Sequence, residues 1–267
     1  MNDYEEFKDN YSRNSYDATA YDRGERVTEN SNRDRYAQSA SATKTLVFRG
    51  VMTRVYLWMT AALMLTAATA FLTVSSPALL QLIYGNTAAV WVLMIAELGL
   101  VMGVSWGINR LSPTQAITLF LIYSVLNGLT LASIFFAYSA GTIYQAFAAS
   151  ALTFGGMSLF GYTTKRDLSG LGGLLLMALI GLIIASVINI FWANSTFDAI
   201  ITYIGVFIFV GLTAYDTQRI KAMSEVAEVY GDAAAPRRVA VLGALSLYLD
   251  FINLFLYILR LFGRGRD

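Results

Sequence analysis

The stretch LSLYLDFINLFLYILRLFG, residues 245–263, is almost entirely apolar but carries an aspartate, Asp250, near its middle. A membrane-spanning helix needs about 20 largely apolar residues, and this stretch nearly supplies them. Acids inside a membrane are costly and usually face a bundle interior or a watery cavity. At about 100° per residue, the polar side chains fall within an arc of about 80°; they are Ser246, Asp250, Asn253, Tyr257 and Arg260. We therefore expect this helix to turn a polar stripe inward.

The composition of the whole chain supports a membrane protein. Hydrophobic residues make up 56% of the 267 residues, and charged residues only 14%, whereas soluble domains hold about 25% charged residues. The charges are uneven, because residues 1–50 contain nine acids and eight bases. This polar region cannot bury enough apolar surface to fold alone. We expect a disordered polar cytoplasmic tail over 1–48 and a membrane domain over 49–267.

Seven apolar runs are long enough to cross a bilayer. They cover about 51–74, 87–108, 115–138, 142–163, 171–193, 197–219 and 238–262. Short connections with turn residues separate most of the runs, and a longer loop is predicted over 220–237. The sequence thus predicts an all-α membrane protein with seven transmembrane helices.

Small residues in the middle runs indicate close packing between helices. The glycines concerned are Gly128, Gly155, Gly156 and Gly161. Lining of a pore is the alternative interpretation of these positions.

Positive charges set the expected orientation, because Lys and Arg that flank a span are retained on the cytoplasmic side. They alternate between connections over the first six runs, which places the N-terminus in the cytoplasm. The seventh run breaks the pattern, since a full crossing would leave Arg260, Arg264 and Arg266 outside. The run either spans fully or returns as a re-entrant segment, and we favour the full span because the run is long enough to cross the bilayer.

Several classes of function are excluded or disfavoured by composition. The chain has no cysteine and no histidine, which excludes disulfides, Ser-His-Asp triads and Cys- or His-ligated metals. We expect no cofactor. Its net charge of +1 and the lack of a basic, aromatic patch give no reason to expect nucleic acid as a partner. A proton-sensitive switch here would have to use carboxylates.

Four ionisable residues in or next to the runs are the candidate site residues. Asp250 either belongs to an ion or proton path, or only forms an interhelical hydrogen bond that holds the bundle together. Asp216 either meets Asp250 or pairs with Arg219 three residues later on its own helix. Arg110 ends the second run and is also explained as a snorkelling anchor. Glu97 is either a lone buried acid or a lining residue.

Several motifs resemble those of the Bax-inhibitor family, also called the transmembrane Bax-inhibitor-motif family. The most specific is SLYLDFINLFLYILRLFG at 246–263. Four others follow the family in order and spacing: NGLTLASIF at 127–135, KRDLSGLGG at 165–173, NIF at 189–191 and YDTQRIK at 215–221. The resemblance covers about 45–267 and is to bacterial members, which implies an integral protein of the bacterial inner membrane.

The resemblance implies a fold in which the last helix is enclosed by the other six. It also implies a pH-sensitive calcium leak channel, in which two aspartates on the sixth and seventh helices share a proton and an arginine exchanges contacts with one of them. These positions match Asp216, Asp250 and Arg110, and Glu97 has a family counterpart.

Calcium would be the permeant ion of such a channel. Asp216 and Asp250 would contact it transiently, because calcium takes about six to eight oxygen ligands and two carboxylates offer a partial set. Glu97, Asn253 and Ser246 are the candidate pore-lining residues.

Two other functions are weighed against the channel. An intramembrane aspartyl protease would also use two aspartates, but Tyr248-Leu249-Asp250 is not its Gly-x-Gly-Asp motif, and we expect no enzymatic activity. A regulator without transport is the main alternative, since some bacterial relatives are thought to restrain a membrane-bound AAA protease through their N-terminus. Residues 1–44 would then bind that partner.

Overall fold

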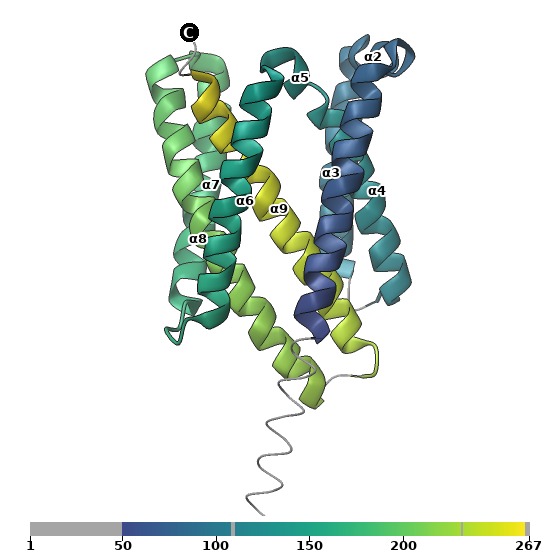
Figure 1. Cartoon of the computed structure of the whole chain (residues 1–267), viewed down its shortest axis with the longest axis vertical. Helices are drawn as coiled ribbons and strands as arrows, with labels where there is room; N and C mark the ends of the chain where they lie inside the picture. The colour runs from purple at the N-terminus through teal and green to yellow at the C-terminus, as the bar shows by residue number, and fades with distance from the viewer. Residues whose placement is uncertain (1–49, 108–109, 231, 265–267) are drawn as a thin grey trace, which may run out of the picture. The chain divides into compact units, whose positions relative to one another are not determined.

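The computed structural model describes residues 50–107, 110–230 and 232–264, and this part of the chain is helical and contains no strand. Seven segments are long and apolar enough to cross a membrane, so the predicted fold class is confirmed. They are a first helix (Gly50–Ser75), α3 (Thr87–Gly107), α4 (Pro113–Leu131) with α5 (Ile134–Ala137), α6 (Ala140–Thr163), α7 (Ser169–Trp192), α8 (Ser195–Tyr230) and α9 (Ala235–Gly263). A short helix, α2 (Pro77–Tyr84), follows the first one (Figure 1). The predicted tail lies outside the described residues.

Local chemistry sets several helix ends. Ser112 caps α4 by accepting from the backbone N–H of Gln115, whose side chain accepts from the backbone N–H of Ser112 in return. Pro113 follows at the first helical position, where its missing N–H is harmless. Ser139 caps α6 in the same way through the N–H of Thr142. Both caps lie in short connections predicted between the apolar runs.

The predicted loop over 220–237 is wrong in extent. Helix α8 continues to Tyr230, and α9 already begins at Ala235. With 36 residues, α8 is about 54 Å long, whereas the hydrocarbon core of a bilayer is about 30 Å thick. The apolar run therefore ended where the helix leaves the membrane, and not where the helix itself ends.

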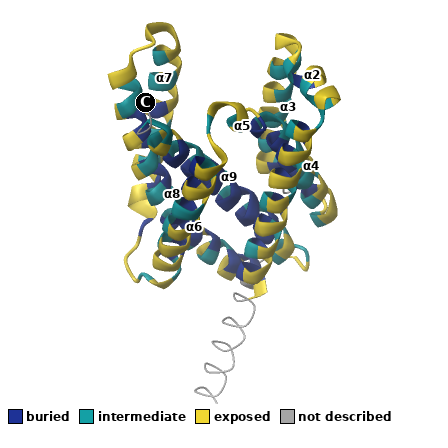
Figure 2. Cartoon of the chain, turned by 45° about the horizontal axis from the view of Figure 1, so that its top comes forward, coloured by how far each residue is buried: buried dark blue, intermediate teal, exposed yellow. Residues whose placement is uncertain are grey.

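Helix α9 forms the core of the bundle. In its most apolar stretch 72% of the residues are buried within the protein, against 6% in α3 and in α7. It packs directly against α4, α6 and α8, while α7 packs on α8 and α3 packs on α4. Figures 1 and 2 show α9 running between the group α6, α7 and α8 and the group α3 and α4, with its middle buried. Enclosure by all six other helices stays a prediction.

A buried hydrogen-bond network fixes α9 against its neighbours. The hydroxyl of Tyr248 lies 2.7 Å from Thr66 Oγ1 and donates to Asn127 Oδ1 at 3.1 Å. Thr66 in turn donates to the carbonyl of Ser124. The ring of Phe120 meets the Tyr248 ring edge-on at 5.5 Å. This cluster joins the first helix, α4 and α9, which sets the rotation of α9 about its axis.

The structure supports a full crossing by α9. At its end, Arg264 forms an ion pair with Asp198 and donates to Thr202 Oγ1, both near the start of α8. Because α9 begins just after the end of α8, it traverses the whole bundle. The ion pair with Asp198 also balances the charge of Arg264, one of the three arginines that break the charge pattern. Another of the three, Arg266, lies outside the described residues.

The expected close packing at glycines holds at two positions and fails at two. A Cβ on Gly161 would lie 2.2 Å from the carbonyl oxygen of Ala214, and one on Gly128 would lie 2.6 Å from that of Thr66. Around Gly155 and Gly156, in contrast, no atom lies within 4 Å of the added Cβ. Only the first two glycines therefore bring helices together.

Candidate functional site

A cavity of about 1010 Å³ lies between α3, α4, α7, α8 and α9. Most of its wall is apolar, as expected inside a membrane protein. Its polar wall consists of Glu97, Tyr123, Thr130, Tyr215, Asp216, Arg219, Ser246, Asp250, Asn253 and Tyr257. Four of the five residues of the predicted α9 stripe face this space, and the fifth, Arg260, does not line it.

Asp216 lies in the middle of α8 and is 9% exposed. Ser246 on α9 donates a hydrogen bond to its Oδ2 at 2.5 Å. Arg219, one turn further along α8, also lines the cavity and interacts electrostatically with the Asp216 carboxylate. The ring of Tyr215 lies against Gly172, where a Cβ would be 2.3 Å from Tyr215 Cζ, so α7 and α8 pack closely beside the carboxylate.

Asp250 lies deeper in the bundle and is 4% exposed. Its side chain and that of Asp216 line the same cavity. Within the described part of the chain, Asp250 Oδ2 has no hydrogen-bond partner. The structure thus brings the two aspartates to one cavity, but the hydrogen bond that Asp216 Oδ2 accepts comes from Ser246. A buried carboxylate oxygen without a donor is expensive, so this site is suited to a proton or a cation.

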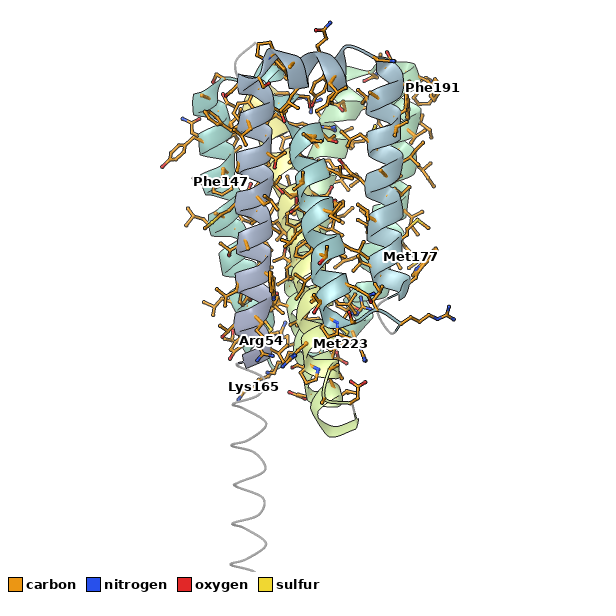
Figure 3. The ribbon with its side chains drawn as sticks, turned by 90° about the vertical axis from the view of Figure 1, so that its right-hand side faces the viewer. Arg54, Phe147, Lys165, Met177, Phe191 and Met223 are labelled. Atoms are coloured by element: carbon orange, nitrogen blue, oxygen red, sulfur yellow. The ribbon has the colours of Figure 1, made fainter. Side chains whose placement is uncertain are left out.

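A second, smaller cavity of about 200 Å³ adjoins the first. It extends toward the end of the bundle where α3 ends and α9 begins, past Ser105 and Met223. Figure 3 shows Met223 near the same end as Arg54 and Lys165. Four residues line both cavities, namely Asp216, Arg219, Ser246 and Leu249. These side chains therefore stand at the boundary between the two spaces.

Glu97 contributes a third carboxylate to the large cavity. Thr130 on α4 donates to Glu97 Oε1 at 2.5 Å. Of the two interpretations of the sequence, the structure favours the lining residue, because Glu97 faces the shared cavity and is paired. Asn253 also lines the cavity, and its Nδ2 donates to the carbonyl of Leu249 on its own helix at 2.8 Å.

The gating role expected for Arg110 stays a prediction. Its side chain is exposed, and within the described residues it forms no ion pair with either aspartate. The cation beside Asp216 is Arg219. The i, i+3 spacing signalled this contact, although the sequence did not show that Arg219 would also line the cavity.

The described residues contain no cluster of three or more acidic side chains that would hold a metal ion tightly. Asp216 and Asp250 with the nearby Ser246 hydroxyl offer an incomplete oxygen set for calcium. Such a set can contact a cation in transit, which is a different task from storing it.

The chain is similar to several known proteins. Residues 48–267 match the family model described as inhibitor of apoptosis-promoting Bax1. The inner membrane protein YbhL of Escherichia coli K12 is 47% identical over 234 residues, covering 87% of this chain and 100% of that protein. An uncharacterized protein of Borreliella burgdorferi is 40% identical over 222 residues, covering 83% and 95% of the two chains. An uncharacterized membrane protein of Streptococcus pyogenes is 47% identical over 171 residues, covering 64% and 72%.

Proposed function

The chain belongs to the family of inhibitors of apoptosis-promoting Bax1, and from this premise we propose that it is a pH-sensitive calcium leak channel of the bacterial inner membrane. Asp216 and Asp250 are its gate. The observation that carries the proposal is that both carboxylates line one cavity, with Asp216 at the boundary to the second cavity. Their burial and shared space favour a common role over two separate structural contacts.

Charge repulsion gives the gate its response to protons. Two carboxylates in a low-dielectric site resist being ionised together. They exchange protons as a coupled pair, so the titration belongs to the pair and not to one residue. While one proton is held, Asp216, Ser246 and Asp250 stay together and close the boundary between the cavities. When that proton leaves, repulsion separates the carboxylates unless a cation or a base compensates.

Calcium then has a path through the two cavities. It enters the large cavity, contacts the two carboxylates, and passes Ser246 and Leu249 into the smaller cavity. The positive charge of Arg219, on the same helix, partly neutralises the negative charge of Asp216 at the boundary between the two cavities. Flux is therefore expected to rise as pH rises through the titration of the pair.

Calcium flux into proteoliposomes tests this mechanism. The purified full chain is reconstituted with a calcium-sensitive dye inside, and initial flux is recorded from acidic to alkaline pH. Asp216→Asn and Asp250→Asn each remove one member of the pair and are expected to abolish most of the pH dependence. Glu225→Gln is the matched control, because Glu225 is exposed on the same helix α8 as Asp216. Flux that depends on pH in both aspartate variants as it does in the wild type contradicts the gate.

The alternative role as a regulator of a membrane AAA protease stays a prediction, because residues 1–44 lie outside the described residues. Deletion of these residues separates the two roles. Loss of partner binding with unchanged calcium flux supports a separate regulatory function, whereas a parallel loss of both does not. Cleavage of a labelled transmembrane peptide, abolished in Asp216→Ala, would instead support a protease.

A further inference from the structure

A third cavity, of about 520 Å³, lies at the end of the bundle where α9 ends. Its polar wall comes from α7, α8, α9 and the residue after α5; the residues are Tyr138, Ser186, Asn189, Asp198, Arg260 and Arg264. None of them lines the cavity of the aspartate pair. Two arginines face one aspartate here, so the wall is net positive.

The charge of Arg264 is already balanced. It forms the ion pair with Asp198 and also donates to Thr202 Oγ1 at 3.2 Å and to the carbonyl of Ser195 at 3.4 Å. These contacts hold its guanidinium against the start of α8. Asp198 is thereby occupied as well, which leaves Arg260 as the source of the excess charge.

Arg260 has no carboxylate partner within the described residues. Its guanidinium carbon lies 5.7 Å from the centroid of the Tyr257 ring, and Tyr257 stacks on Phe209 at 5.8 Å. A guanidinium held over an aromatic ring keeps its N–H donors available at its edge. The side chain is exposed, so these donors can meet a ligand at the cavity mouth.

Asn189 adds a neutral donor to the same wall. Its Oδ1 accepts a hydrogen bond from the backbone N–H of Asn194 at 3.2 Å, so its amide N–H groups are directed away from that contact. The Ser186 hydroxyl donates to the Leu182 carbonyl and therefore acts here as an acceptor. A positive guanidinium with a nearby amide donor is suited to an oxyanion.

The position along the bundle indicates which oxyanion is available. Phe191 and Trp192 are the last residues of α7, directly after Ile190, which lines this cavity, and they are 82% and 72% exposed. An exposed tryptophan at a helix end, such as Trp192, is typical of the membrane–water interface. Figure 3 shows Phe191 at the end of the bundle opposite to Arg54 and Lys165. Lipid phosphates lie at this depth.

We propose that this cavity binds the phosphate of a membrane phospholipid, with Arg260 as its main ligand and Asn189 as a second donor. Arginine presents a planar pair of N–H groups that matches two phosphate oxygens. The proposal also explains why an arginine is tolerated at this end of α9 without an acidic partner. It is independent of calcium transport, because no residue of the aspartate pair takes part.

Thermal unfolding of the purified full chain in detergent tests the proposal with three probes. Phosphatidylglycerol carries both phosphate and acyl chains, diacylglycerol carries the chains alone, and inorganic phosphate at constant ionic strength carries the anion alone. We expect phosphatidylglycerol to raise the Tm of the wild type and diacylglycerol to leave it unchanged. A rise with diacylglycerol equal to that with phosphatidylglycerol overturns phosphate recognition.

Arg260→Gln is the decisive variant, and Arg166→Gln is its control because Arg166 is exposed in the connection between α6 and α7. Losing the charged hydrogen bonds is expected to raise the phosphatidylglycerol concentration needed for half of the Tm shift about tenfold or more. Arg166→Gln should respond like the wild type. An unchanged response of Arg260→Gln overturns the site.

Two further results complete the test. If inorganic phosphate alone reproduces an Arg260-dependent shift and the lipid adds nothing, the lipid is overturned as the source of the phosphate. If Arg260→Gln does not fold, Arg260→Lys keeps the charge but loses the planar fork, and its lipid response should be weaker than that of the wild type. An equal response of Arg260→Lys and the wild type would then refute the role of the fork.

Discussion

The hydrogen bond from Ser246 to Asp216 gives the sharpest prediction about the gate. The serine O–H stabilises the ionised carboxylate, because Ser246 donates to Asp216 Oδ2 at 2.5 Å in a buried setting. Ser246→Ala removes this donor without changing the charge of either aspartate. Loss of the proton from the pair then becomes harder, and calcium flux should begin at a higher pH.

The size of this effect follows from the energy of the contact. A hydrogen bond to a charged group contributes about 1.5–3 kcal/mol, and one pH unit corresponds to about 1.4 kcal/mol. The midpoint of the curve of flux against pH should therefore rise by about 1 to 2 pH units. The maximal flux at high pH should change little, since both carboxylates remain.

The assay is the proteoliposome flux measurement across pH, with two companion variants. Ser246→Thr keeps a hydroxyl at the same position and should restore most of the midpoint. Ser150→Ala removes a buried serine that donates to the Ala146 carbonyl within α6, and it should leave the midpoint unchanged. A midpoint that stays constant or falls in Ser246→Ala would refute the role assigned to this contact.

Two further predictions concern stability in detergent. Gly161→Ala should lower the Tm clearly, because the new Cβ would lie 2.2 Å from the backbone oxygen of Ala214. Gly156→Ala is the control and should leave the Tm unchanged, because its Cβ meets no atom within 4 Å. Equal Tm values for the two variants would contradict the close packing of α6 on α8. The hydrogen bond from Arg238 holds the pKa of the exposed Asp232 carboxyl below its usual value, so its contribution to stability is present above the unfolded pKa and disappears as pH falls through the folded one. Between about pH 5 and about pH 3 the wild type should lose slightly more stability than Asp232→Asn, and a larger loss in the variant would reverse the sign argued here.

The transmembrane segments were predictable because lipid leaves the backbone few choices. Each polar backbone group must be satisfied within its own segment, so an apolar run of sufficient length forms a helix. Turn residues then marked where helices begin, as at Ser112 and Pro113. The same reasoning failed beyond Arg219, because hydropathy follows the membrane boundary while helix formation does not. The helix α8 therefore continues through a segment that was predicted to be a loop.

The candidate site was only half predictable. Helical periodicity placed Ser246, Asp250, Asn253 and Tyr257 on one face of α9, and all four line the large cavity. Periodicity within one helix contains no information about how far that helix is rotated or tilted against another. The sequence therefore indicated Asp216 as a candidate partner of Asp250, but it did not predict that Ser246 would donate a hydrogen bond to Asp216.

The sequence by itself determined that the chain crosses a membrane with seven helices and that α9 carries an inward polar stripe, since both properties depend on local length and periodicity. Only the tertiary structure decided that Asp216 and Asp250 share a cavity, that Arg219 also lines this cavity, and that Arg260 faces a separate space. These outcomes depend on contacts between distant segments, such as Gly161 against Ala214 and Tyr248 against Thr66. Such contacts fix the rotation and separation of whole helices, and no single helix encodes them.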